Sequence, residues 1–285
     1  MKHLLTMEGV DRATLDSLLD DADEFYEVMH RPIPKVPALR GKTVATMFFE
    51  PSTRTKLSFE RAAKALSADT LSFSPGTSSL KKGESLKDTV LTVKAMGADL
   101  MVVRHKSTGA AWRVAEWADL PVVNGGDGAH QHPTQALLDA LTLRQHFGSL
   151  DGLRIAIVGD IRHSRVARSD VWAYTTLGAE VTLVAPPTLL PPDLSGWPVT
   201  ASTDFDDVLT EVTLTSTSGL EVDLTVRAPR NASSPRPLII MLAGKGTGRD
   251  AARYTAKTRG VVVAALSYPY RGDEKAGVVS LVLDL

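Results

Sequence analysis

The chain has 285 residues, a formal net charge of −1 and no cysteine, and 43% of its residues are hydrophobic and 23% charged. This length is sufficient for two domains, and the composition is that of a globular protein, neither disordered nor fibrous. The balanced charge gives no reason to expect nucleic acid or a membrane as a partner, and the lack of cysteine excludes disulfides, a thiol nucleophile and thiolate metal sites, so we expect a cytoplasmic protein.

The N-terminal segment is expected to contain one amphipathic helix. From Asp11 to Met29, apolar residues recur at three- and four-residue steps, which is the spacing of one helix face. Prolines at positions 32, 34 and 37 then end the helix.

A strand followed by a helix is predicted next. Residues 43–49 form an apolar run, Pro51 stops it, and Ser52 and Thr53 stand where they can cap a helix. Hydroxyls and Arg54 at a helix start can hold an anion, because first-turn N–H groups lack intrahelical partners and guanidinium binds phosphate with two hydrogen bonds. The alternative is an ordinary serine cap followed by solvated Arg54 and Lys56. The apolar positions of this helix include Leu57, Ala62, Ala63 and Leu66.

Further alternation of strands and helices follows. We expect strands at 70–73, 99–103 and 121–123, helices at 84–96 and 110–118, and an exposed loop at 74–84. This order predicts a parallel sheet with helices on both faces, whose ligands lie beyond the carboxyl ends of the strands. Arg54, Arg104 and the segment after Val123 all fall at that edge.

The segment 124–135 leads into a helix that runs to about Phe147. It contains three glycines, and Pro133 suits a first helical position. His130 and His132 could bind a metal, but neither has an acidic or histidine partner four residues later, so we expect no metal. We instead interpret this segment as one that places a neutral histidine and an amide over a carbonyl group.

The second half opens as a Rossmann-like unit. A strand is expected at 153–158, a helix to about Leu177 and a strand at 180–184, but the glycine pattern of a dinucleotide site is absent, so no such cofactor is expected. A proline-rich connection, 186–198, should lead to a short acidic helix that ends near Leu209.

The sequence changes character after about residue 210. Residues 211–216 and 221–226 read as an antiparallel hairpin. We expect a strand at 238–242, a glycine-rich loop at 244–248, a helix to about Arg259 and a strand at 260–266.

Five motifs follow one another along the chain: residues 49–56, 79–84, Arg104, 132–135 and 159–165. Together they resemble the aspartate carbamoyltransferases of pyrimidine synthesis. The resemblance covers about residues 3–209 and implies two α/β domains, each a parallel sheet flanked by helices, the second Rossmann-like and either incomplete or continued by a foreign tail. The loop 79–84 favours the aspartate over the ornithine enzymes, because the ornithine enzymes lack its lysine.

The resemblance implies that the amine of L-aspartate attacks the carbamoyl carbon of carbamoyl phosphate and expels phosphate, with no cofactor. The implied roles are phosphate binding by Ser52, Thr53, Arg54 and Thr55, carbamoyl binding by Arg104, His132 and Gln135, and aspartate carboxylate binding by Arg165. Arg54, Arg104 and His132 would be the catalytic residues. Ser79 and Lys82 resemble residues that a neighbouring subunit contributes, so a homotrimer with shared active sites is implied.

The resemblance ends in the second domain. The Arg-x-Gln motif and C-terminal helix of the family are absent, and residues 211–268 instead resemble the opening of an α/β-hydrolase without its nucleophile motif. The predicted organisation is a carbamoyl phosphate domain (1–132), a linking helix (133–150), a partial aspartate domain (151–209) and a hydrolase-like fragment (210–285). Three alternatives to an active transferase stay open: a protein that binds carbamoyl phosphate without turnover, a hydrolase, and a fusion of two gene fragments.

Overall fold

The computed structural model describes residues 1–73 and 84–204, and beyond them the strand segments 210–216, 221–227, 238–245, 254–256 and 261–268. The chain divides into two compact units, one comprising Met1–Gly9 and Ala13–Leu137 and the other Val10–Arg12 and Leu138–Leu285. No helix among the described residues is long and apolar enough to cross a membrane.

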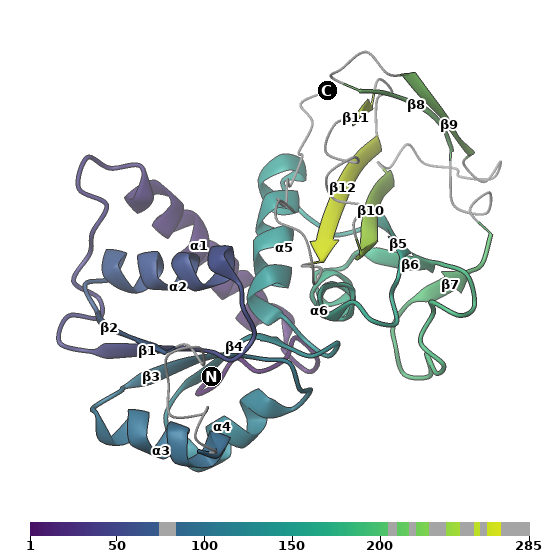
Figure 1. The fold of residues 1–285 in the computed structure, drawn as a ribbon. Helices are drawn as coiled ribbons and strands as arrows, with labels where there is room; N and C mark the ends of the chain where they lie inside the picture. The colour runs from purple at the N-terminus through teal and green to yellow at the C-terminus, as the bar shows by residue number, and fades with distance from the viewer. Residues whose placement is uncertain are drawn as a thin grey trace. The chain divides into compact units, whose positions relative to one another are not determined.

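The first unit is built on a four-stranded parallel sheet with the strand order β2-β1-β3-β4 (Figure 1). These pairings confirm the predicted parallel sheet. The strands run parallel because the helix after each strand returns the chain to the edge of the sheet where that strand began. The strands are β1 (Thr43–Phe48), β2 (Asp69–Phe73), β3 (Leu100–His105) and β4 (Val122–Asp127), and the helices are α1 (Arg12–Met29), α2 (Thr53–Ala65), α3 (Leu86–Ala95) and α4 (Ala110–Ala118).

Helices cover both faces of this sheet, with α1 and α2 on one side and α3 and α4 on the other (Figure 1). Side chains alternate between the two faces of a strand, so β1 contributes to two separate clusters. Ala45 and Met47 pack with Val90 and Val114 of α3 and α4, while Val44 and Phe48 belong to the other cluster, with Ala63 of α2. Two apolar cores therefore hold the sheet from both sides.

The expected helix faces are only partly correct. In α1, Leu15 and Leu19 are buried as expected, but Phe25 and Tyr26 are exposed. In α2, Ala63 is buried, whereas Leu57 is 57% exposed. A pattern of apolar residues shows which face is available for packing, but only tertiary contacts decide how far along a helix the packing extends.

The second unit contains a five-stranded parallel sheet with the order β12-β10-β5-β6-β7. Strand β10 pairs with β5 from Leu238↔Arg154 to Ala243↔Gly159. The strands from the distal part of the chain thus complete the Rossmann-like sheet, since the backbone groups along one edge of β5 find partners in β10. The bounds are β5 (Arg154–Gly159), α6 (Arg165–Thr176), β6 (Glu180–Val184), β7 (Thr200–Ser202), β10 (Leu238–Lys245) and β12 (Val261–Tyr268), and α5 (Pro133–Phe147) precedes them.

A separate antiparallel sheet has the order β11-β8-β9. Its strands β8 (Thr210–Ser216) and β9 (Glu221–Arg227) confirm the predicted hairpin. The predicted helix that runs to about Arg259 is wrong at the described residues, because Tyr254–Ala256 form strand β11, which pairs with β8. Tyrosine and threonine favour strands, and β11 has a partner in β8. The predicted acidic helix that ends near Leu209 stays a prediction, because residues 205–209 lie outside the described residues; Thr200–Ser202 before them form β7, which pairs with β6.

Candidate active site

Three strands of the first sheet deliver polar side chains to one edge. Arg54 follows β1 at the start of α2, Arg104 lies near the end of β3, and His132 comes after β4 and directly before α5. Because the strands are parallel, these positions share the carboxyl-terminal edge of the sheet, as the sequence predicts.

The start of α2 carries groups that are able to bind an anion, the hydroxyls of Ser52 and Thr53 and the guanidinium of Arg54. Ser52 occupies the N-cap position with an extended backbone, but its side chain makes no capping hydrogen bond; its hydroxyl instead donates to Thr55 Oγ1 at 3.0 Å. The position of the cap is therefore confirmed, and the side-chain capping bond is not. Thr53 and Arg54 are exposed to solvent. The first-turn N–H groups and the guanidinium thus stand together where a phosphate can approach.

Arg104 is a buried cation at the carboxyl-terminal edge of this sheet. Only 2% of its side chain is exposed; Nη2 donates to Glu50 Oε1 at 2.8 Å and Nη1 to the carbonyl oxygen of Gly125 at 3.2 Å. The ion pair offsets the desolvation of the guanidinium, and two fixed acceptors define its orientation. A buried, oriented cation of this kind is suited to stabilise a negative charge that develops on a substrate oxygen.

His132 and Gln135 stand at the start of α5. His132 is buried, and its carbonyl oxygen accepts hydrogen bonds from the backbone N–H of Gln135 at 3.0 Å and of Ala136 at 3.3 Å. Its Nδ1 lies 3.4 Å from the hydroxyl of Thr134. Pro133 occupies the first helical position, as predicted. The backbone of His132 is therefore tied to the first turn of α5, and Gln135 belongs to the same turn.

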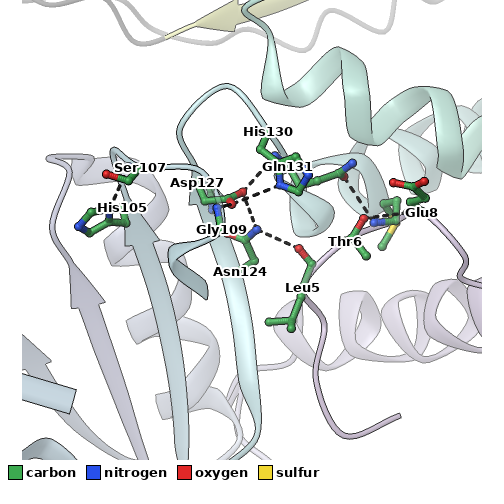
Figure 2. A network of polar contacts seen from close by, with 12 residues as sticks. Leu5, Thr6, Glu8, His105, Ser107, Gly109, Asn124, Asp127, His130 and Gln131 are labelled. Atoms are coloured by element: carbon green, nitrogen blue, oxygen red, sulfur yellow. Dashed lines mark hydrogen bonds and ion pairs between the residues drawn. The ribbon is translucent and has the colours of Figure 1, made fainter. Parts of the chain in front are cut away.

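A buried polar network lies between the ends of β3 and β4, and Figure 2 shows it around Asp127. The carboxylate of Asp127 accepts hydrogen bonds from Gly109 N at 2.7 Å, Asn124 Nδ2 at 2.9 Å and Gln131 N at 3.1 Å. Nearby, His105 Nδ1 accepts from Ser107 N at 2.9 Å, and burial lowers the pKa of His105, so this imidazole is neutral at pH 7.

Three predicted site residues remain, Arg165, Ser79 and Lys82. Arg165 is the first residue of α6 in the second unit; it is buried, and the preceding Ser164 caps the helix by accepting from Ala167 N at 3.1 Å. Ser79 and Lys82 lie outside the described residues. Within the described parts of both units, no group of three or more histidine, cysteine or acidic side chains could hold a metal ion.

Sequence reasoning gave no role to Glu50 or Asp127, although both stand inside the segments it singled out. The register of the sheet accounts for Glu50: Phe48 pairs with Arg104, which places the acid two residues later near the arginine, but the sequence alone does not give this register. Asp127 was missed although three of its partners, Asn124, His130 and Gln131, lie within four residues of it, because no sequence pattern predicts these contacts; its fourth partner, Gly109, comes from the start of α4.

Residues 2–145 match the family model described as aspartate/ornithine carbamoyltransferase, carbamoyl-P binding domain. The chain is 55% identical over 234 residues to an aspartate carbamoyltransferase catalytic subunit from Thermobifida fusca, a match that covers 82% of this chain and 73% of the relative. It is 57% identical over 209 residues to the catalytic subunit from a Parafrankia species, which covers 73% of this chain and 68% of the relative.

Solved structures give the same result. A crystal structure of aspartate transcarbamoylase from Trypanosoma cruzi in complex with carbamoyl phosphate and aspartate is similar, with a TM-score of 0.68 and 28% identity over 84% of this chain and 72% of that chain. The catalytic subunit from M. jannaschii has a TM-score of 0.68 and 30% identity over 93% of this chain and 85% of that one. The chain belongs to the family of aspartate carbamoyltransferase catalytic subunits.

Proposed function

We propose that the chain transfers the carbamoyl group of carbamoyl phosphate to the amine of L-aspartate, giving N-carbamoyl-aspartate and phosphate. The observation that carries this proposal is the convergence of the α2 N-terminus, buried Arg104 and His132 on one edge of the first sheet. The T. cruzi enzyme with the same fold is solved with both substrates bound.

The phosphate group would lie at the start of α2. Ser52, Thr53 and Thr55 offer hydroxyls and Arg54 a guanidinium, next to first-turn N–H groups that carry partial positive charge. Arg54 would also neutralise the charge that accumulates on the departing phosphate.

The carbamoyl group would be held by Arg104, His132 and Gln135. When the aspartate amine attacks, the carbonyl oxygen becomes an oxyanion, and donors already aimed at its position lower the barrier without reorganising. Arg104 is fixed by Glu50 and Gly125, and His132 by the first turn of α5, so both donors are preorganised. Collapse of the tetrahedral intermediate releases phosphate, and neither step needs a covalent bond to the protein.

The finer assignments belong to the same proposal. Arg165 would bind a carboxylate of aspartate, Ser79 and Lys82 would complete the site of a neighbouring subunit, and the assembly would be a cytoplasmic homotrimer. The four-part domain division and the hydrolase-like origin of residues 210–285 stay predictions. Their support is the resemblance of the motifs in the sequence.

Replacing Arg54 with alanine should reduce kcat for carbamoyl-aspartate formation by about 10³-fold, because the phosphate loses its charged donor. Arg61→Ala is the matched control, since Arg61 is also exposed on α2 but lies beyond its first turn, and it should retain activity within about threefold of the unchanged chain. Equal losses in the two variants would contradict the phosphate site. A folded chain that binds phosphate but forms no carbamoyl-aspartate would instead support the alternative of a protein that binds carbamoyl phosphate without turnover.

A further inference from the structure

The carboxyl-terminal ends of β3 and β4 are joined by an irregular pairing. The register is regular up to Val103↔Asn124 and shifts before His105↔Asp127, so β4 advances by three residues while β3 advances by two. The extra residue forms a bulge, and Gly126 within it has a φ of +114°, a conformation that favours glycine.

This bulge directs a backbone carbonyl at Arg104. The carbonyl oxygen of Gly125 accepts from Arg104 Nη1 at 3.2 Å, and the N–H of Gly126 donates to Asn124 Oδ1 at 2.9 Å. A regular strand would place its carbonyl groups in the ladder of the sheet. The orientation of Arg104 therefore depends on how the bulge is held.

Asp127 holds the bulge and the loop before His132 at the same time. Its carboxylate is 1% exposed; Oδ1 accepts from Asn124 Nδ2 and from Gln131 N, whereas Oδ2 accepts from Gly109 N and lies 3.3 Å from His130 Nδ1. Figure 2 shows these groups around the carboxylate. Gln131 is adjacent to His132, and Asn124 opens the bulge that faces Arg104.

We propose that Asp127 is a positioning residue that fixes Arg104 and His132 relative to each other, so that both reach one carbamoyl oxygen; this rests on the proposed function. Asp127 itself touches no reacting atom. It acts through the bulge on Arg104 and through the Gln131 backbone on His132. A carboxylate is required because both oxygens accept hydrogen bonds, and two of the donors are backbone N–H groups that cannot turn away.

Asp127→Asn is the test with the least change in volume. One oxygen becomes an NH2 group, which then faces an N–H donor, so one hydrogen bond becomes a repulsive contact. A displacement of about 1 Å at a reacting group can cost about 10² in rate. We therefore expect kcat for carbamoyl transfer to fall by about 10²-fold, while the affinity for inorganic phosphate stays within about threefold, because phosphate binds at α2.

Binding provides a measurement that does not depend on turnover. Phosphonoacetamide keeps the phosphoryl and carbamoyl groups of the substrate and has a methylene in place of the bridging oxygen. By calorimetry, the unchanged chain should bind it at least about 10-fold more tightly than phosphate, and Asp127→Asn should lose that preference. Val114→Ala, which opens a cavity in the buried core of the same unit, is the control for loss of stability and should keep the preference.

The outcomes separate the two proposals. If Asp127→Asn loses the preference for phosphonoacetamide and still binds phosphate, the positioning role of Asp127 is supported. This holds even if the unchanged chain makes no product, because that result overturns only the transfer reaction. The positioning role is overturned if Asp127→Asn retains both the preference for phosphonoacetamide over phosphate and the kcat of the unchanged chain. It is also overturned if Asp127→Asn and Val114→Ala both lose phosphate binding. An unchanged chain that shows no preference for phosphonoacetamide overturns the carbamoyl site and the role of Asp127 with it.

Discussion

Replacing Arg104 with methionine should lower kcat for carbamoyl transfer by about 10²–10³-fold, the usual cost of removing one donor to an oxyanion. Methionine fills much of the same buried space, so the packing of β3 is largely kept. The substitution leaves Glu50 without the guanidinium, but Glu50 is 24% exposed and water can partly solvate its carboxylate. The expected loss is therefore mainly catalytic, and it is measured by steady-state kinetics at saturating substrates.

Arg104→Lys provides the matched control. Lysine keeps the positive charge but lacks the planar fork that contacts Glu50 and the Gly125 carbonyl together, so it should restore only part of the rate. A methionine variant that is folded and retains kcat within about threefold would contradict the assignment of Arg104 to the oxyanion.

Replacing Asp170 with asparagine should stabilise the protein at neutral pH. Asp170 lies on α6 and is completely buried, and neither of its carboxylate oxygens accepts a hydrogen bond from any residue that the structure describes. Burial, and then the charge of Asp139, raise the pKa of Asp170 well above its ordinary value. The hydroxyl of Tyr174 stays protonated for the same reasons, because burial and these two acids raise its pKa.

The sign of the pH dependence follows from proton linkage. The folded state holds a proton on Asp170 at pH values where the unfolded state has lost it, so this group lowers stability as the pH rises above the ordinary carboxyl pKa of about 4. An asparagine at this position carries no ionisable proton and therefore has no such penalty. The melting temperature of Asp170→Asn should match that of the unchanged chain near pH 4 and exceed it by about 3–6 °C at pH 7–8, equivalent to about 1–2 kcal/mol.

Asp193→Asn is a suitable control because Asp193 is exposed, and hydrogen bonding from the side chain of Ser195, and then from its backbone N–H at 2.7 Å, lowers the pKa of Asp193. Its replacement should leave the melting temperature unchanged or slightly reduced across the same pH range. A lower melting temperature for Asp170→Asn at pH 8 would mean that the Asp170 carboxylate has a compensating partner.

The sequence predicted the elements that depend on local patterns. The apolar run before Pro51, the proline at the start of α5 and the hairpin β8–β9 each have a recognisable residue pattern, and the structure confirms all three. The strands β10 and β12 were also predicted, together with the suggestion that they extend the second sheet.

The failures have a common physical cause. Strands β7 and β11 are short segments whose structure depends on partners distant in the sequence. The bulge beside Arg104 is a register shift between two strands, which no periodicity records. Side-chain types predicted the chemistry of the site, whereas its geometry depends on pairings across the sheet.

The central claim is best tested by following the new bond directly. The purified chain is incubated with [13C]carbamoyl phosphate and [15N]aspartate, and the carbamoyl carbon is observed by NMR. We predict that the signal of carbamoyl phosphate is replaced by one that shows 13C–15N coupling, with one phosphate released for each coupled product. Release of phosphate without a coupled carbon signal, or no change in a chain shown to be folded and to bind phosphate, would contradict carbamoyl transfer to aspartate.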